Sequence, residues 1–192
     1  MKILETERLS IREVEADRDA EFMLQLLNSP KFIQYIGDRN VRSVNESHDF
    51  IRDRYRKSYE VNGYGLYAVE LKPDVNDSIG EQIGVCGFVR RDSLPAPDIG
   101  FAFLPKHEGK GYGFESANAL LGFGRETLNF TEVLAITTLD NNVSGKLLEK
   151  LGFVLQEITE MPDGERLKLF RIDLSMESHG NKNKMNAENS SR

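Results

Sequence analysis

The feature that most constrains this chain is a turn with three alternating glycines, GKGYG at residues 109–113. The segment before it, DIGFAFL at 98–104, has the length and apolar character of a strand, and the segment after it, 113–128, has the apolar spacing of a helix. Because glycine lacks a Cβ atom, successive backbone N–H groups of such a turn can point into one concavity. The helix N-terminus adds a partial positive charge, so the turn is a predicted binding site for an anion such as a pyrophosphate.

Taken alone, the glycines also fit a structural turn that binds nothing. The pattern differs from a P-loop, since no Gly-Lys-Ser/Thr follows at the required place. It also differs from the dinucleotide-binding fingerprint, because the third glycine comes too early and no repeating βαβ unit surrounds it.

The rest of the chain predicts an α+β fold, in which helices pack on a mixed, largely antiparallel sheet. Ser43 and Glu46 have capping-box spacing at the start of one helix, and Asp17 is a candidate cap for another. Polar residues at 72–82 predict a loop, and Pro162-Asp163-Gly164 predicts a turn. The predicted strands cover residues 9–14, 65–71, 83–90, 98–104, 132–138, 153–159 and 167–174, and the predicted helices cover 17–27, 31–36, 43–59, 113–128 and 143–151.

The length of 192 residues suits one well-buried domain, which we place at residues 1–174. Residues 175–192 contain almost no apolar side chains and are predicted to be a disordered polar tail. The formal net charge of −6 is unlike a broadly basic surface, so no direct nucleic-acid partner is expected. An acidic chain is compatible with a cationic or amine substrate.

The sequence contains no run of about 18 apolar residues, so no membrane span is predicted. The charged N-terminus lacks the apolar centre of a signal peptide. The single cysteine, Cys86, excludes an internal disulfide, and we therefore expect a cytoplasmic protein without a membrane partner. Cys86 lies in the apolar run IGVCGFV and is interpreted as a buried strand cysteine, with a reactive thiol as the alternative.

Three ordered blocks of the sequence resemble the GNAT superfamily of N-acetyltransferases. Residues 98–115, from Asp98-Ile99-Gly100 through the glycine turn to Glu115, are similar to its acetyl-CoA-binding motif. ETERLSIRE at 5–13 is similar to the first strand of the ribosomal-protein N-terminal acetyltransferase (RimJ/RimL-like) branch. NNVS at 141–144 and LEKLGF at 148–153 resemble the second motif of that branch. The resemblance covers residues 1–174 and implies the GNAT acyl-CoA N-acyltransferase fold, with a splayed central strand pair and flanking helices.

The resemblance implies that acetyl-CoA binds as a cosubstrate, with its pantetheine arm between the splayed strands. Glu108 stands where the family usually has Arg or Gln, which removes a side-chain contact but leaves the backbone amides. Asn141 contacts the pantetheine arm or its bound water in this interpretation, and is a plain turn residue in the alternative. The residues implied to contact the cosubstrate are Phe101, Ala102, Phe103, Leu104, Glu108, Gly109, Lys110, Gly111, Tyr112, Gly113, Asn141 and Ser144.

The resemblance also implies direct attack of a neutral amine on the thioester, which needs a base for the amine proton and an acid for the leaving thiolate. Asp98 is a candidate base, or else a solvated carboxylate at the end of a strand. Glu115 is a candidate for the same proton transfer, or else a carboxylate that interacts with the helix dipole. Ser144 matches the serine proposed as the acid in the RimL-like branch, or else it caps a helix. Many family members have a tyrosine acid where this chain has Leu148, so a tyrosine acid is not expected.

The family builds its acceptor pocket from the first two helices and nearby loops, here about residues 22–59 and 64–70. The mixed-sign segment 52–57 is typical of a solvated helix face, with a contact to the 3′-phosphate of CoA or to a partner protein as the alternative. The leading hypothesis is acetyl transfer to a primary amine, with protein N-terminal α-amino groups favoured. Small amines (polyamines, aminoglycosides or amino acids) and a CoA-binding module without catalysis are the alternatives. A monomer or a homodimer is expected.

Histidine, cysteine and aspartate residues do not follow metal-ligand spacing, so no metal is expected. His107 precedes the glycine turn and is interpreted as a surface or packing residue. No Gly-x-Ser-x-Gly motif is present, and a serine hydrolase has no support.

Overall fold

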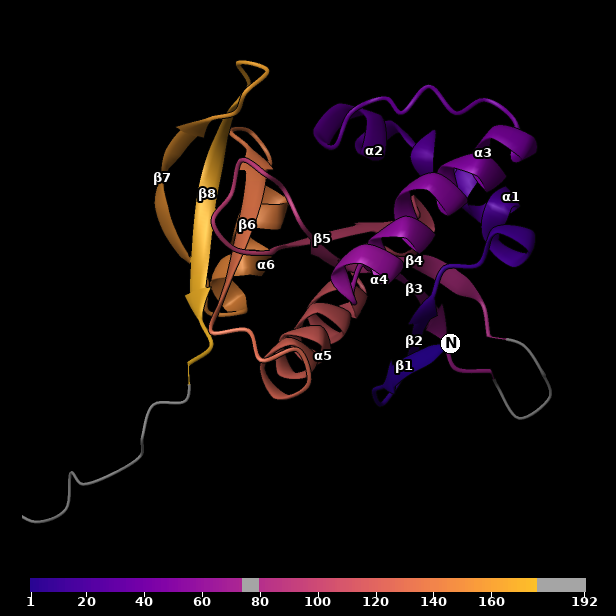
Figure 1. The fold of residues 1–192 in the computed structure, drawn as a ribbon, viewed down its shortest axis with the longest axis horizontal. Coiled ribbons are helices and arrows are strands. Elements are labelled where there is room, and N and C mark those ends of the chain that lie inside the picture. Colours follow the sequence, from indigo (N-terminus) through magenta and orange to yellow (C-terminus); the bar gives the residue numbers. More distant parts are fainter. Residues whose placement is uncertain (74–79, 176–192) are drawn as a thin grey trace, which may run out of the picture.

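The computed structural model describes residues 1–73 and 80–175. Eight strands form one sheet in the order β1-β2-β3-β4-β5-β6-β8-β7 (Figure 1). All neighbouring strands are antiparallel except β5 and β6, which are parallel. The predicted fold class, an α+β fold with a mixed, mostly antiparallel sheet, is therefore confirmed. The predicted tail lies outside the described residues apart from Ser175, as does the centre of the predicted loop at 74–79.

The elements follow the predicted order closely. The strands are β1 (Lys2–Glu5), β2 (Leu9–Glu13), β3 (Leu66–Leu71), β4 (Gln82–Val89), β5 (Asp98–Phe103), β6 (Glu132–Thr138), β7 (Val154–Glu160) and β8 (Arg166–Asp173). The helices are α1 (Ala16–Leu27), α2 (Pro30–Tyr35), α3 (Val44–Phe50), the π-helix η1 (Ile51–Arg56), α4 (Lys57–Asn62), the 3-10 turn η2 (Pro105–His107), α5 (Tyr112–Glu126) and α6 (Asn142–Lys150).

Helices cover both faces of the sheet, because alternate residues of each strand point to opposite sides. In β3, Val69 packs in the same core as Leu120 of α5, whereas its neighbour Ala68 packs in a second core with Met23 of α1. Cys86 of β4 is fully buried, as predicted, and burial raises the pKa of its thiol to about 12. A reactive thiol at this position is therefore excluded at neutral pH.

The parallel pair β5–β6 divides the sheet. A single pair of residues, Asp98 and Leu134, aligns the two strands, after which they diverge. Figure 1 shows the result: β6, β8, β7 and α6 stand on one side of the divergence, and α1 to α4 stand on the other. The splayed strand pair expected from the sequence is present.

Three local details differ from the sequence predictions: the first strand, the helix predicted at 43–59 and the N-cap of the first helix. Strand β1 was not predicted, and it pairs antiparallel with β2, with Leu4 opposite Ile11. The predicted helix at 43–59 is one continuous helical stretch that runs on to Asn62, with a π-helical segment at its centre. Its start is as predicted, since the side chain of Ser43 and that of Glu46 complete a capping box.

The cap predicted for the first helix is wrong. Glu15, not Asp17, is the N-cap residue of α1, and its own side chain makes no capping hydrogen bond. Its backbone N–H instead donates to Asp19 (2.8 Å), whose buried carboxylate also accepts two hydrogen bonds from Arg12 of β2 (2.7 Å each). Arg12 in turn donates to Glu70 of β3. This buried network fixes α1 on the sheet through contacts that no local pattern encodes.

Candidate functional site

The glycine turn presents unpaired backbone donors at the start of α5. Gly109 and Gly111 have φ values of 71° and 85°, a region that favours glycine, and Gly111 is the N-cap residue of the helix. In the part of the chain that the structure describes, the backbone N–H groups of residues 109–114 find no acceptor. Residues 109–111 are exposed, and a Cβ atom placed on Gly109 would meet nothing within 4 Å. The turn is therefore open, and its donors fit an anion.

A clamp from the β1–β2 turn fixes this helix start. Glu115 accepts hydrogen bonds from the hydroxyl of Thr6 (2.5 Å), the backbone N–H of Arg8 (2.9 Å) and the Arg8 guanidinium (2.7 Å). The same guanidinium donates to the carbonyl of Lys110 (3.1 Å) and lies 4.6 Å from the ring centroid of Tyr112. These contacts join residues more than 100 positions apart in the sequence, so no local pattern indicates the role of Arg8.

The clamp bears directly on the predicted role of Glu115. Burial acts to raise the pKa of this carboxyl, but the hydrogen bonds from Thr6 and Arg8 outweigh it and hold the pKa below its usual value. A carboxylate that accepts these bonds and has a lowered pKa is a weak base. The geometry therefore favours a positioning role for Glu115 over proton transfer.

Past the aligned pair Asp98–Leu134, the edge of β5 that faces β6 directs backbone groups into the divergence between the two strands. The N–H of Leu104 donates to Ile83 of β4 (3.0 Å), and successive residues of a strand direct their N–H groups to opposite edges. Of the four residues predicted to contact the cosubstrate here, Phe101 and Phe103 thus direct backbone groups toward the divergence. Ala102 and Leu104 direct theirs toward β4.

Asp98 lies where β5 and β6 meet. Its side chain is 2% exposed and accepts a hydrogen bond from the guanidinium of Arg91 (2.9 Å). Burial raises the pKa of Asp98, and the charge of Arg91 opposes that rise. The solvated strand-end alternative for Asp98 is wrong, because the carboxyl is buried. A carboxylate whose pKa is raised by burial is a stronger base than a solvated one, which suits Asp98 to accept a proton.

The predicted Asn141–Ser144 block starts α6. The side chain of Asn141 accepts from the N–H of Ser144 (3.1 Å) and is the N-cap, so the capping role belongs to Asn141. The Ser144 hydroxyl is half-buried and has no hydrogen-bond partner among the described residues. Leu148 is buried in the core, one turn further on. Ser144 is therefore free to donate a hydrogen bond, whereas Leu148 has only a packing role.

Two residues beside the turn carry side-chain contacts that the sequence did not predict. Glu108 forms an ion pair with Lys31 of α2, which links the helical layer to the glycine turn. His107 is buried, as a packing residue would be, with its Nε2 atom 3.2 Å from the carboxylate of Glu81. Lys110 is exposed and forms no ion pair with the described residues, so its ammonium can reach a bound anion.

Across 1–73 and 80–175, no group of three histidine, cysteine, aspartate or glutamate side chains could hold a metal ion. No helix formed by these residues is long and apolar enough to cross a membrane.

Comparisons with known proteins agree with this geometry. Residues 8–154 match the family described as an acetyltransferase (GNAT) domain. An uncharacterised N-acetyltransferase of Bacillus licheniformis, p20, is 29% identical over 177 residues, which cover 92% of this chain and 94% of that protein.

Two of the solved structures that share the fold are complexes with coenzyme A. RimL, a ribosomal L7/L12 α-N-protein acetyltransferase in complex with coenzyme A, has a TM-score of 0.75 at 17% identity, with 90% of this chain and 98% of that chain covered. The spermidine N-acetyltransferase of Vibrio cholerae, in complex with CoA and spermine, has a TM-score of 0.70 at 20% identity, with 88% and 98% covered.

Proposed function

The chain belongs to the GNAT acetyltransferase family and is an N-acetyltransferase that uses acetyl-CoA, and we propose that its favoured acceptor is the α-amino group of a protein. A small-molecule amine is the alternative acceptor. The likeness to RimL supports the first, and the likeness to the spermidine acetyltransferase supports the second. The open glycine turn, beside a strand pair that diverges after Asp98, is the observation that carries the cosubstrate assignment.

We assign the pyrophosphate of acetyl-CoA to the backbone N–H groups of residues 109–114, with Lys110 as an additional cation. The backbone groups of Phe101 and Phe103 are assigned to the pantetheine arm. The path along β5 from Phe103 to Asp98 is five residue steps, or ~17 Å at ~3.3 Å per residue. An extended arm that follows this path places the thioester toward Asp98, where the strands meet.

Acetyl-CoA supplies the acetyl group as a thioester, and the residues of this chain position the proton transfers. The amine nitrogen bonds to the acetyl carbon, and the carbon–sulfur bond breaks. We assign Asp98 to accept the amine proton, directly or through water, because its pKa is raised by burial. We assign the free hydroxyl of Ser144 to donate a hydrogen bond to the leaving thiolate. Backbone N–H groups of β5 that face β6 can stabilise the developing oxyanion.

The cosubstrate assignment is tested by calorimetric titration of acetyl-CoA into the wild type and the Gly111→Ala variant. Alanine at a left-handed position costs about 1–2 kcal/mol, and affinity is expected to fall about tenfold. The new Cβ atom would also lie 3.3 Å from the Arg8 guanidinium. Gly122→Ala is the matched control within α5, because a Cβ atom there meets nothing within 4 Å. Unchanged affinity in Gly111→Ala would contradict the assignment.

The acceptor is tested by CoA release from acetyl-CoA over a panel of amines. Fastest turnover with peptides that have a free α-amino group supports the proposal. Fastest turnover with spermidine, an aminoglycoside or an amino acid supports the small-molecule alternative. Binding of acetyl-CoA without turnover of any amine would make the chain a CoA-binding module instead.

A further inference from the structure

Thr137 of β6 has a buried hydroxyl without a hydrogen-bond partner. The residue is 8% exposed, and its Oγ1 atom is among the few buried side-chain atoms of residues 1–73 and 80–175 that neither donate nor accept a hydrogen bond. The neighbouring Thr138 differs, since its hydroxyl donates to Asp140 (2.8 Å). A buried polar group without a partner lowers stability, so a folded protein that retains one calls for an explanation.

The strand register shows on which face of the sheet Thr137 lies. Thr137 is two residues beyond Ala135, which packs in the same core as Leu148 of α6, and residues two apart in a strand share a face. Thr137 is also directly opposite Lys168 of β8, whose ammonium lies 3.4 Å from the side-chain oxygen of Asn142. Both observations place the Thr137 side chain on the face that the start of α6 covers.

Thr137 also borders the divergence between β5 and β6. It is three residues past Leu134, as Phe101 of β5 is three residues past Asp98, so Thr137 and Phe101 stand at the same level of the two strands. This level is ~10 Å from the aligned pair, at ~3.3 Å per residue. Phe101 and Phe103 pack toward the same core as Ala135 and are only half-buried. The divergence is thus bordered by Phe101 on one side and by Thr137 on the other.

The backbone of β6 contributes to the same border. The N–H of Leu134 donates to the carbonyl of Pro97 beside β5 (2.9 Å), so the N–H groups of Ile136 and Thr138 also point to this edge of β6. Among the described residues, no strand pairs with this edge beyond Leu134. Two backbone donors and the Thr137 hydroxyl therefore border the divergence from the β6 side.

We propose that the Thr137 hydroxyl binds an amide of the pantetheine arm of acetyl-CoA from the β6 side, an inference that rests on the proposed function. Each amide of the arm has a carbonyl that accepts and an N–H that donates, and a threonine hydroxyl can do either. Thr137 lies ~10 Å from the place where the strands meet, so it is level with the arm and not with the thioester. The bound arm supplies the partner that the hydroxyl lacks, and the free protein retains the hydroxyl at a cost in stability.

The test compares the full-length wild type with Thr137→Val, which replaces the hydroxyl by a methyl group in a side chain of the same shape. Calorimetric titration measures the Kd of acetyl-CoA and of 3′-phospho-ADP, which is CoA without its pantetheine arm. Thermal unfolding without ligand measures Tm, and Thr137→Ser restores the hydroxyl. Thr138→Val makes the same change at the adjacent position, and Ser47→Ala removes a second buried hydroxyl without a partner, on α3.

Thr137→Val is expected to weaken acetyl-CoA binding about fivefold, the scale of one neutral hydrogen bond, and to leave the Kd of 3′-phospho-ADP unchanged. The loss should appear in KM for acetyl-CoA while kcat is kept, and Thr137→Ser should recover the wild-type Kd. The Tm of Thr137→Val should rise by a few degrees, because the unpartnered hydroxyl is gone. Ser47→Ala should also raise Tm but change neither Kd, and Thr138→Val should change neither Kd.

An unchanged Kd for acetyl-CoA in Thr137→Val overturns the inference, makes the hydroxyl a tolerated defect of the core and leaves the acetyltransferase function standing. An equal loss for acetyl-CoA and 3′-phospho-ADP, or a lower Tm, shows that Thr137 acts through the fold. A lower kcat at unchanged KM places the hydroxyl at the reacting atoms and not on the arm. Failure of the wild type to bind acetyl-CoA overturns both this inference and the proposed function.

Discussion

At the glycine turn the groups that face the ligand are backbone N–H donors of residues 109–114, whereas at the acceptor end the group is the side chain of Asp98, which Arg91 contacts through a 2.9 Å hydrogen bond. The turn is built by glycines that are adjacent in the sequence. The acceptor end forms only where β5 meets β6, strands that are joined through α5, and where Arg91 of the β4–β5 loop reaches Asp98. The two ends of one site thus follow different rules: the cosubstrate end depends on backbone conformation, and the acceptor end depends on tertiary packing.

The largest effect is expected where the two ends meet. Asp98→Asn should lower kcat about 100-fold, the scale of general base catalysis, and leave the affinity for acetyl-CoA unchanged. The base acts in its deprotonated form, and burial raises its pKa above the usual 3.8. Wild-type kcat should therefore rise with pH through that raised pKa, and the variant should lack this limb of the profile.

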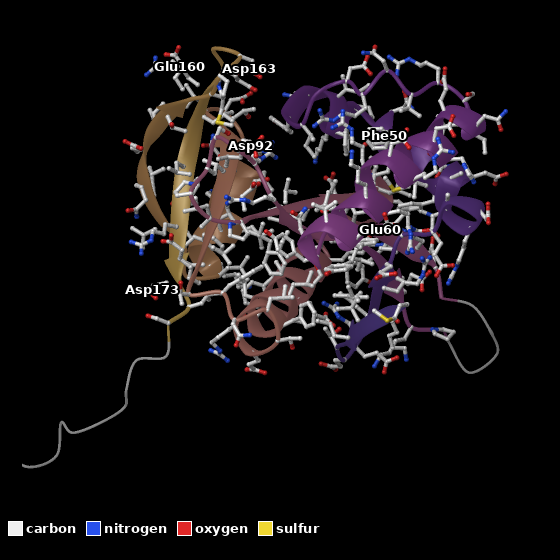
Figure 2. The ribbon with its side chains drawn as sticks, in the orientation of Figure 1. Phe50, Glu60, Asp92, Glu160, Asp163 and Asp173 are labelled. Atoms are coloured by element: carbon white, nitrogen blue, oxygen red, sulfur yellow. The ribbon has the colours of Figure 1, made fainter. Side chains whose placement is uncertain are left out.

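Asp92→Asn is the matched control, because Asp92 is an exposed carboxylate in the same β4–β5 loop (Figure 2). It should keep the wild-type kcat and pH profile. A wild-type pH profile in Asp98→Asn would assign the base to another group, and a weakened affinity for acetyl-CoA would place Asp98 in the cosubstrate end.

The cosubstrate end is expected to contain one catalytic side chain. Ser144→Ala should lower kcat about tenfold with an unchanged Kd for acetyl-CoA, since a single hydrogen bond to a charged group is lost in the transition state. Val143→Ala is the control at the adjacent, 79% exposed position. If Ser144→Ala turns over like the wild type, the leaving thiolate is stabilised by water or by backbone donors alone, and this end contains no catalytic side chain.

The same contrast explains what the sequence could predict. Strand β5, the turn and α5 follow from local periodicity and glycine spacing, and the capping box at Ser43 follows from residues three positions apart. The role of Arg8 and the surroundings of Asp98 depend on contacts that form only in the folded chain. The first strand was missed because a four-residue edge strand leaves little periodicity to recognise.

A smaller effect is expected at Glu115, where a side chain positions the backbone donors. Glu115→Gln should lower the free energy of unfolding by about 1 kcal/mol, an amount reduced by the partial exposure of Arg8. The pKa of Glu115 is lowered in the folded state, so its contribution is present above its usual value of 4.5 and is lost as pH falls through the lowered pKa. Chemical denaturation at a series of pH values from 7 downward should show that the difference in unfolding free energy between Glu115→Gln and the wild type disappears in that range.

Glu126→Gln is the control, because Glu126 pairs with Arg125 at the exposed far end of the same helix. The two roles of Glu115 predict opposite results. A positioning residue affects stability and, by a few-fold, the Kd for acetyl-CoA, while kcat is kept. A large loss of kcat at unchanged stability would restore the base role and place proton transfer at the cosubstrate end.

The smallest effect is expected at the contact that links the helical layer to the glycine turn, the ion pair between Glu108, the residue just before the turn, and Lys31 of α2. Glu108 places a negative charge beside the donors assigned to the pyrophosphate. Glu108→Gln should therefore tighten acetyl-CoA binding, and Lys31→Gln should weaken it, each by about two- to threefold because exposed charges are strongly screened. Both shifts should shrink as salt concentration rises in calorimetric titrations. If both variants weaken binding equally, the ion pair acts by fixing α2 against the turn, and the cosubstrate end depends on the helical layer as well as on its own backbone.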